Sequence, residues 1–318
     1  MNTSVRQATR AAVSVRGLRK AYGEKVVLDG VDLHIGEGEV FALLGPNGAG
    51  KTTTVKILST SIPADGGTAA VLGHDLPAEA AAVRALIGVT GQFSAVDDLL
   101  TAEENLTLMG RLLHVPPAER RARVASLLER FDLVEAAKQT PATYSGGMRR
   151  RLDIAMTLMG RPRLIFLDEP TTGLDPRSRH IMWQLIRDLV ADGVTVLLTT
   201  QYLEEADQLA DRVAVLDHGR IVAEGTPEEL KRRIPGAHIR LRLADAGALD
   251  AAALALPEGT RDDEELTLRV PNEGGVRSLR DVLARLGDDV SVDDLSIHTP
   301  DLDDVFFALT STVKEQNR

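Results

Sequence analysis

The sequence predicts an α/β protein with a mostly parallel sheet, followed by a small α+β domain. Strand-like and helix-like runs alternate from Leu164 to Gly219, which is typical of a parallel sheet with helices on its faces. The glycine-rich stretch GPNGAGKTTT follows a strand-like run, EVFALLG, and leads into a helix-like run. After GTPEELKRRIPG the pattern changes, so we expect a boundary near Pro235 and Gly236, between domains of residues 1–235 and 236–318.

The expected elements follow in order along the chain. The β-rich runs AVSVRG and VVLDGVDLHI come first. Between about residues 95 and 160, ENLTLMGRLLHV and ERRARVASLLERFDLVEAA carry apolar residues at three-and-four spacing, which predicts two helices, the second opened by Pro116 and Pro117. The last domain offers the strands HIRLRL and LTLRV, the helix VRSLRDVLARL, the strand VSVDDLSIH and the helix LDDVFFALT.

Composition restricts the class of protein and its setting. With 43% hydrophobic and 26% charged residues over 318 positions, the chain has the composition of a globular protein. The absence of cysteine excludes disulfides, thiolate nucleophiles and zinc-thiolate sites, which fits a cytosolic protein. The first ten residues, MNTSVRQATR, lack the apolar centre of a signal peptide. No run of about 18 apolar residues occurs, so we expect any membrane span to belong to another subunit.

The negative charge is concentrated in the last domain. From residue 239 to the end there are 9 Lys and Arg against 17 Asp and Glu, which gives −8 of the total of −10. Such a domain repels nucleic acid and anionic lipid, so we expect neither as a direct partner.

The stretch GPNGAGKT fits the pattern G-x-x-x-x-G-K-[ST], with a strand before it and a helix after it. Glycines allow successive backbone N–H groups to turn inward, where they and the helix N-terminus bind phosphate oxygens. Lys51 adds a charge for the β- and γ-phosphates, and the Thr52 hydroxyl is a magnesium ligand. The predicted nucleotide-binding residues here are Gly45, Pro46, Asn47, Gly48, Ala49, Gly50, Lys51, Thr52 and Thr53.

Two acidic residues end the apolar run LIFLDE. Asp168 is the expected acidic partner that holds Mg²⁺, directly or through water. Glu169 is the candidate general base, because a carboxylate beside the metal site can orient and deprotonate the attacking water. The sequence therefore predicts a site for a nucleoside triphosphate, Mg²⁺ and a water molecule.

A longer motif lies at residues 143–176, which read TYSGGMRRRLDIAMTLMGRPRLIFLDEPTTGLDP. This stretch resembles the nucleotide-binding subunit of ATP-binding-cassette transporters, whose signature loop is most often Leu-Ser-Gly-Gly-Gln. Here the loop is Tyr144-Ser145-Gly146-Gly147-Met148, which keeps the serine and both glycines and departs at the first and last positions. The resemblance covers about Val13 to Gly225 and implies a P-loop cassette with an antiparallel β edge and a helical subdomain at about residues 95–160.

The resemblance also implies further site residues and a partner. Tyr22 matches the aromatic residue that stacks on adenine, although an ordinary aromatic at a strand end remains the alternative. Gln92 matches the glutamine that meets magnesium and the attacking water, and Asp175 lies in the loop Gly173-Leu174-Asp175 that links the two sites of a dimer. Two copies would meet head to tail, with ATP and Mg²⁺ between the phosphate loop of one and Ser145, Gly146 and Gly147 of the other.

Gln201, in TTQYLEEAD, stands where this family usually has histidine. Glutamine keeps a donor and an acceptor at similar reach, but it cannot take up a proton near neutral pH. Since Glu169, Gln92, Lys51, Thr52 and Asp168 are all present, we interpret Gln201 as part of a retuned catalytic site, less sensitive to pH between about 5.5 and 7.5.

Two further stretches, QYLEEADQLADRVAVLDHGRIVAEGTPEEL and the ending DLDDVFFALT, resemble the ATPase subunits of daunorubicin/doxorubicin exporters. This implies an ATPase at the cytoplasmic face of the membrane, which powers drug or natural-product export through a separate permease. In that group the LDDVF segment belongs to assembly or regulation, whereas the residues alone allow Leu302–Leu309 to complete the core of the last domain.

Three alternatives remain open on the sequence. An importer subunit differs from an exporter subunit only in its partners. A cassette protein acting on ribosomes or DNA predicts tandem cassettes or a long insertion, whereas Lys51 and Asp168 are 117 positions apart in a single cassette. A regulator that does not hydrolyse nucleotide is supported only by Gln201.

Overall fold

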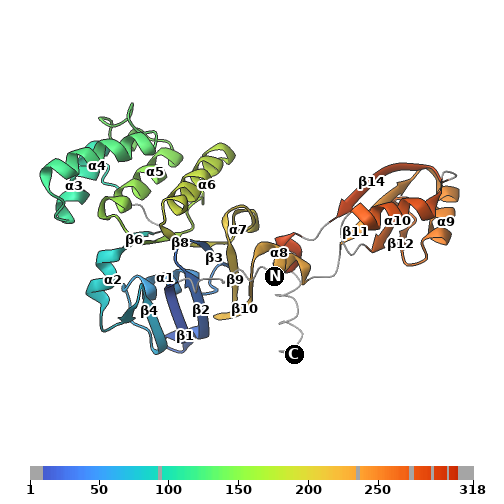
Figure 1. Ribbon diagram of the computed structural model, residues 1–318, viewed down its shortest axis with the longest axis horizontal. Helices are drawn as coiled ribbons and strands as arrows, with labels where there is room; N and C mark the ends of the chain where they lie inside the picture. Colours follow the sequence, from blue (N-terminus) through green and yellow to red (C-terminus); the bar gives the residue numbers. More distant parts are fainter. Residues whose placement is uncertain are drawn as a thin grey trace, which may run out of the picture. The chain divides into compact units, whose positions relative to one another are not determined.

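The structure is a computed structural model that describes residues 10–91, 95–233, 237–271, 276–287, 290–298 and 301–306. Contacts within the chain divide it into two units, Met1–Pro227 and Glu228–Arg318 (Figure 1), and each is described by itself below. The boundary expected at Pro235 and Gly236 lies outside the described residues.

The first unit contains the expected mostly parallel sheet. Its order is β10-β9-β3-β8-β7-β6, in which all neighbours are parallel except β10 and β9. The three central strands β3, β8 and β7 are buried along their whole length, as expected of nearly continuous apolar runs with helices on both faces. The six strands are β10 (Arg220–Gly225), β9 (Arg212–Asp217), β3 (Val40–Leu44), β8 (Thr195–Thr200), β7 (Leu164–Asp168) and β6 (Ile87–Thr90).

A second, antiparallel sheet forms the β edge of this unit. Its order is β2-β1-β4-β5, and β1 pairs with both β2 and β4. One hydrophobic cluster joins Val13 and Ile35 of this sheet, Val55 of α1, and Phe41 and Phe166 of the parallel sheet. Helix α1 (Lys51–Leu58) is therefore anchored in the same core as both sheets. The strands are β1 (Ala11–Tyr22), β2 (Lys25–Gly36), β4 (Gly66–Val71) and β5 (His74–Leu76).

The helical subdomain occupies the predicted segment. Figure 1 shows α3, α4 and α5 (green) on the opposite side of the unit from β1, β2 and β4. Helix α3 begins with a capping box between Thr101 and Glu104, and α4 begins at Pro117, as expected. The second predicted helix is too long at its carboxyl end: α4 stops at Arg130, and Asp132 adopts a left-handed φ of 52°. The helices of the first unit are α1, α2 (Ala80–Leu86), α3 (Ala102–Leu112), α4 (Pro117–Arg130), α5 (Gly146–Thr157), α6 (Pro176–Ala191) and α7 (Leu203–Leu209), with short turns η1 (Pro141–Thr143) and η2 (Leu158–Gly160).

The second unit is a small α+β fold with a core of its own. An antiparallel sheet of order β12-β13-β11-β14 packs with α9 through residues such as Leu241, Leu249 and Leu268. Helix α9 and strand β12 were not predicted. Among the described residues, this core does not include Leu302 or Val305, although both are buried. The elements are α8 (Pro227–Arg232), β11 (His238–Leu243), α9 (Ala246–Ala255), β12 (Thr260–Asp262), β13 (Thr267–Pro271), α10 (Val276–Leu286) and β14 (Val292–His298), and residues 302–306 are also helical.

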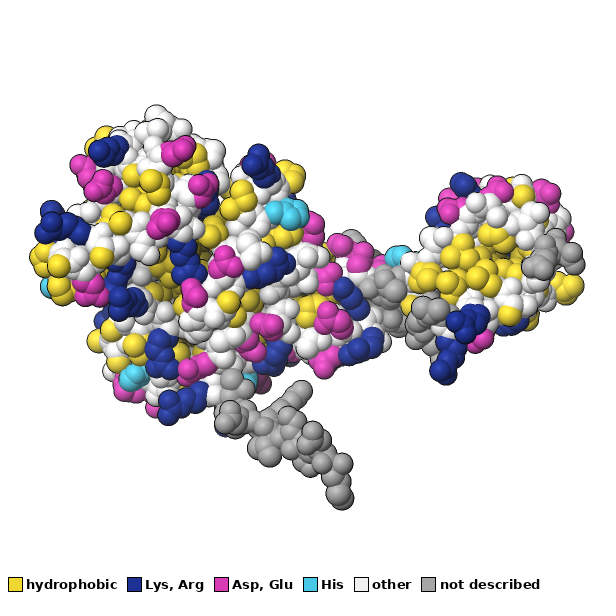
Figure 2. Space-filling view, turned by 45° about the horizontal axis from the view of Figure 1, so that its top comes forward, with side chains coloured by type: hydrophobic (Ala, Val, Ile, Leu, Met, Phe, Trp, Pro, Cys, Tyr) yellow, Lys and Arg dark blue, Asp and Glu magenta, His cyan; other side chains and the backbone are white. Residues whose placement is uncertain are grey.

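On the face of the first unit seen in Figure 2, positive and negative side chains are interspersed. None of the described helices is both long and apolar enough to span a bilayer.

Candidate active site

The predicted site residues follow strands that end side by side. In the sheet register Leu44 of β3 pairs with Thr200 of β8, and Asp168 of β7 pairs with Thr199. The amide of Gly45 donates to the carbonyl of Thr200 at 3.2 Å, which joins the starts of two loops. Because parallel strands end at one edge of a sheet, that edge gathers side chains from distant parts of the chain. We call residues 45–53, Asp168, Glu169 and Gln201 together the carboxyl edge.

Gln92 lies outside the described residues. The strand before it, β6, ends at Thr90 and pairs with β7 in the same sheet. Its predicted role therefore stays a prediction.

The loop of residues 45–50 needs glycine at two close approaches. A Cβ on Gly45 would lie 2.2 Å from the carbonyl oxygen of Leu216, and one on Gly50 would lie 2.6 Å from Cδ2 of Leu28. Gly50 also has a φ of 113°, in a region that other residues rarely adopt. The tip of the loop is open, since Asn47 and Gly48 are exposed and Pro46 is half-buried, while Ala49 is buried. The loop thus presents backbone at a surface, beside the start of α1.

Lys51 is buried and turned towards this loop. Its Nζ donates to the carbonyl of Gly45 at 2.6 Å and to that of Pro46 at 3.1 Å, and it lies 3.8 Å from Oε1 of Glu169. Burial lowers the pKa of Lys51, while the negative charges of Glu169 and Asp168 oppose the change. The ammonium therefore lies between the loop and the acidic residues, where it can reach a phosphate by exchanging its carbonyl partners.

Asp168 is held by two hydroxyl groups. Its Oδ1 accepts from Thr52 Oγ1 at 3.2 Å and from Thr199 Oγ1 at 2.5 Å, and the residue is only 3% exposed. Thr53, next to Thr52 in α1, is half-buried. The sequence did not single out Thr199, although its place at the end of the apolar run VTVLL gave a signal. The aspartate is thus fixed by both its predicted neighbour and one that only the sheet register reveals.

Glu169 adopts a strained backbone conformation. Its φ is 50°, an arrangement that costs a residue other than glycine about 1–3 kcal/mol. Its amide donates to the carbonyl and to Oγ1 of Thr199, both at 3.1 Å, and Thr172 Oγ1 donates to its carboxylate at 3.3 Å. These bonds hold the carboxylate at the edge, facing Lys51.

Gln201 and Tyr22 are the two remaining predicted residues of this region. Gln201 directly follows β8 and is half-buried. Tyr22 ends β1, is 51% exposed, and has the ammonium of Lys20 5.6 Å from its ring centroid. An exposed ring face at this point is available for stacking.

The signature loop, Tyr144–Met148, forms a separate group of contacts with the start of α6. Ser145 caps α5 by accepting from the amide of Met148 at 3.2 Å. A Cβ on Gly147 would lie 2.6 Å from Oγ of Ser178, so the two helix starts are in close contact. Ser145 and Gly146 are exposed.

Asp175 serves as the cap of α6. Its Oδ1 accepts from the amide of Ser178 at 3.0 Å and its Oδ2 from the hydroxyl at 2.6 Å. These bonds lower the pKa of Asp175. Both oxygens of this carboxylate therefore accept hydrogen bonds from Ser178 of the same chain, next to the signature loop.

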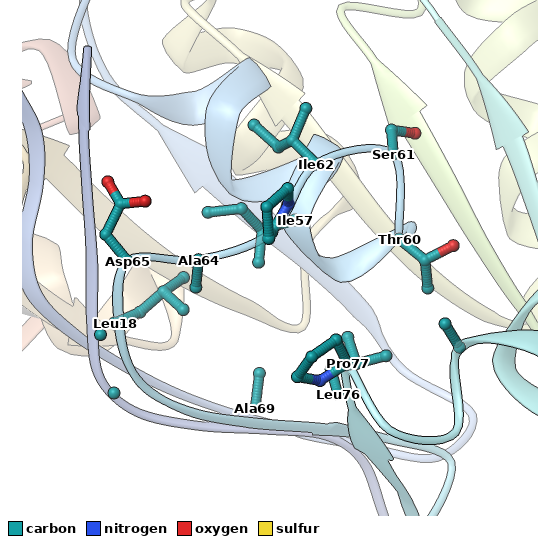
Figure 3. A pocket seen from close by; sticks show the side chains of 14 residues that line it. Leu18, Ile57, Thr60, Ser61, Ile62, Ala64, Asp65, Ala69, Leu76 and Pro77 are labelled. Atoms are coloured by element: carbon teal, nitrogen blue, oxygen red, sulfur yellow. The ribbon is translucent and has the colours of Figure 1, made fainter. Parts of the chain in front are cut away.

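A hollow of about 470 Å³ elsewhere in the unit is not part of this site (Figure 3). It lies at the carboxyl end of α1, whereas the phosphate loop lies at the amino end. None of the predicted site residues lines it. Its apolar lining includes Leu18, Ile57, Ile62, Ala69, Leu76 and Pro77.

Comparisons with known proteins point to one family. The family described as ABC transporter matches residues 28–172. A daunorubicin/doxorubicin resistance ATP-binding protein of Streptomyces peucetius is 48% identical over 315 residues, which cover 98% of this chain and 94% of the relative. The Nod factor export ATP-binding protein I of Ralstonia nicotianae is 46% identical over 218 residues, covering 69% of this chain and 68% of that protein.

Among solved structures, a dimeric ATP-binding cassette in a post-hydrolysis state, bound to ADP and Pi, matches with a TM-score of 0.61 and 29% identity. The match covers 67% of this chain and 98% of that one. The chain therefore belongs to the ABC transporter family, as an ATP-binding and ATP-hydrolysing protein similar over nearly its whole length to the daunorubicin/doxorubicin resistance ATP-binding protein.

Proposed function

We propose that this chain powers the export of drugs or other hydrophobic natural products through a separate membrane-spanning permease, at the cytoplasmic face of the membrane. The observation that carries the proposal is the similarity along nearly the whole chain to a daunorubicin/doxorubicin resistance protein, including the second unit. A relative named for Nod factor export, similar over two thirds of the chain, favours export over import.

The carboxyl edge supplies the groups that ATP hydrolysis requires. Backbone N–H groups of the loop after Pro46 and at the start of α1 bind the phosphates, and Lys51 balances their charge. Glu169 acts as the general base, because its backbone amide is fixed by Thr199, its carboxylate accepts from Thr172 Oγ1, and that carboxylate lies 3.8 Å from the ammonium of Lys51. Gln201 and Gln92 orient the γ-phosphate and the water, and Tyr22 stacks on the adenine.

Thr52 and Asp168 suit a magnesium ion. A hydroxyl and a carboxylate oxygen 3.2 Å apart are hard oxygen donors, and Mg²⁺ typically takes one or two protein oxygens together with phosphate oxygens and water. Bound to Thr52 and Asp168, Mg²⁺ would supply positive charge against the negative charge that develops on the phosphates during hydrolysis. Within the described residues no group of three or more His, Cys, Asp or Glu is arranged as a metal site, so the nucleotide would supply most of the ligands.

The signature loop acts in a second copy of the chain. Ser145 and Gly146 are exposed at the start of α5, where a hydroxyl and backbone amides are suited to bind the γ-phosphate held by the partner. The dimeric cassette bound to ADP and Pi supports a pair of chains, for which we propose the head-to-tail arrangement.

A hollow lined by both apolar and charged side chains supports the proposed permease contact. It has a volume of about 460 Å³ and lies between the helical subdomain and β6. Val89, Leu112 and Leu113 line it and are 43%, 62% and 45% exposed. Exposed apolar side chains gathered in one hollow mark a surface for another protein.

The test is to isolate the complex and measure transport. The Glu169→Gln chain, purified from membranes of the native host with ATP, should retain a multi-span protein identifiable by mass spectrometry. Inverted vesicles that contain that protein and the parent chain should accumulate doxorubicin with ATP, and vesicles with Glu169→Gln should not. Retention of a substrate-binding lipoprotein, or accumulation that is independent of ATP, would contradict the proposal.

A further inference from the structure

The guanidinium of Arg150 joins the carboxyl edge to the helix that begins at the signature loop. Arg150 lies in α5, which starts after Ser145. Its Nε donates to the carbonyl of Pro170 at 3.1 Å, its Nη2 to that of Asp168 at 3.1 Å, and its Nη1 to that of Gly91 at 2.9 Å. Three segments far apart in the sequence are thus held by one side chain.

The two carbonyls at 168 and 170 flank Glu169. That residue has the left-handed φ of 50°, which persists only where the surroundings enforce it. Its own amide is fixed by Thr199, and Arg150 holds the carbonyl of the residue before it and that of the residue after it. The third carbonyl, of Gly91, directly precedes the loop that contains Gln92. One guanidinium therefore holds the carbonyls of Asp168 and Pro170, before and after Glu169, together with that of Gly91.

Asp153, one turn further along α5, fixes Arg150 in turn. Its Oδ2 accepts from Arg150 Nη1 at 3.3 Å, and its Oδ1 accepts from the amide of Ala95 at 3.1 Å. The side chains of Arg150 and Asp153 are 12% and 4% exposed. Together they hold Gly91 and Ala95, on both sides of residues 92–94, and Asp153 also lines the hollow proposed for the permease.

We propose that Arg150 is a positioning residue for hydrolysis, which holds the turn of Glu169 and the carbonyl of Gly91 in one arrangement relative to α5, and that Asp153 keeps its guanidinium in place. A fork of five N–H donors can span three carbonyls and a carboxylate, whereas a lysine ammonium cannot cover the same geometry. The inference rests on the proposed function, since it requires Glu169 to act on the attacking water.

The test is the steady-state kinetics of the full-length chain with Arg150→Ala and Arg150→Lys. A catalytic group displaced by about an ångström loses up to ~100-fold in rate, so kcat should fall ~10- to 100-fold for alanine and by a smaller factor for lysine. The KM for ATP should stay within about twofold, because Lys51, Thr52 and the phosphate loop are untouched. Arg149→Ala is the matched control: Arg149 is the neighbouring residue and pairs with Asp98 on the exposed side, so its kcat should stay near that of the parent.

A second measurement separates positioning from general stability. In a Glu169→Gln background, Arg150→Lys should lower kcat no further, because both changes act on the same step. The inference is overturned if Arg150→Lys and Arg150→Ala keep the parent's kcat, if their loss lies in the KM for ATP, or if the loss adds fully to that of Glu169→Gln. If Arg150→Ala does not fold, the lysine variant decides. If Glu169→Gln itself hydrolyses ATP like the parent, the proposed function of Glu169 has failed instead.

Discussion

The carboxyl edge and the signature loop differ in how far their polar groups are satisfied within one chain. At the edge, Lys51 and Asp168 are 5% and 3% exposed, and each has partners from other segments of the same chain. At the signature loop, Ser145 and Gly146 are exposed, and the contact described for the serine hydroxyl is the cap of its own helix. The proposed site between two chains requires this difference, since the buried groups of one chain would act together with the exposed signature loop of the other.

Among the changes at the carboxyl edge, Glu169→Gln should lower ATP turnover the most. The amide keeps the size of the side chain and loses the base, so turnover should fall by ~10²- to 10⁴-fold while ATP binding is retained. Phosphate release and equilibrium binding of a fluorescent ATP analogue measure the two quantities. Near-normal turnover would show that Glu169 is not the base.

Ser145→Asp tests the proposed role of the exposed signature loop. Aspartate still caps a helix, but it places negative charge where the partner's γ-phosphate is proposed to lie, so turnover should fall ~100-fold with unchanged binding of ATP to the isolated chain. Thr101→Ala removes the cap of α3, which is remote from nucleotide, and serves as the control for lost helix stability. Equal turnover in Ser145→Asp and the parent would remove the signature loop from the site.

Changes at Gln201 should lower turnover less than changes at Glu169 or Ser145. Gln201→Ala should slow turnover ~10-fold, the value of one hydrogen bond to a charged group. Gln201→His should be tolerated, with turnover that changes with pH around 6.5, near the pKa of histidine. Rates measured between about pH 5.5 and 7.5 compare the three proteins. An alanine variant as active as the parent would make Gln201 a bystander.

The smallest effect is expected at Glu205, which supports the segments beside the edge. It is fully buried, and its Oε1 accepts from Thr171 at 2.8 Å and from Trp183 at 3.3 Å. Burial raises its pKa above the ordinary 4.5, so the folded state binds this proton more tightly than the unfolded state. Its contribution to the free energy of unfolding is thus present below pH 4.5 and is lost as the pH rises through the raised pKa.

Glu205→Gln removes that titration. The parent should therefore lose stability as the pH rises above 4.5, whereas the variant should not lose this contribution. The difference in Tm, variant minus parent, should grow with pH, by about 2–4 °C for each kcal/mol that the parent loses. Thermal unfolding followed by circular dichroism at several pH values measures the difference. Parallel curves for the two proteins would show that Glu205 does not titrate in this way.

The sequence was enough for the architecture and for most of the edge. Asp168 ends an apolar strand and Glu169 follows it, whereas Lys51 and Thr52 were predicted from the glycine-rich motif that follows another such strand. Thr199, Arg150 and Glu205 were missed because their partners are backbone groups or side chains from segments that only the register brings close.

In the second unit, the sequence predicted some elements and missed others. Strands β11, β13 and β14 and helix α10 were predicted from alternation and helical spacing, whereas α9 and the short strand β12 were missed. The alanine-rich stretch of α9, AGALDAAALA, lacks the amphipathic spacing on which helix prediction depends. The LDDVF segment was left between two interpretations, and its buried Leu302 and Val305 lie outside the core of the unit.

The most direct test of the split site is hydrolysis by mixed dimers of two inactive chains. Lys51→Met disables the carboxyl edge, and Ser145→Asp disables the signature loop. In a head-to-tail pair that contains one of each, one composite site keeps both Lys51 and Ser145. We predict that mixing the two purified chains restores ATP hydrolysis, up to about a quarter of the parent rate for random pairing of active halves. A mixture as inactive as either chain alone would contradict the account.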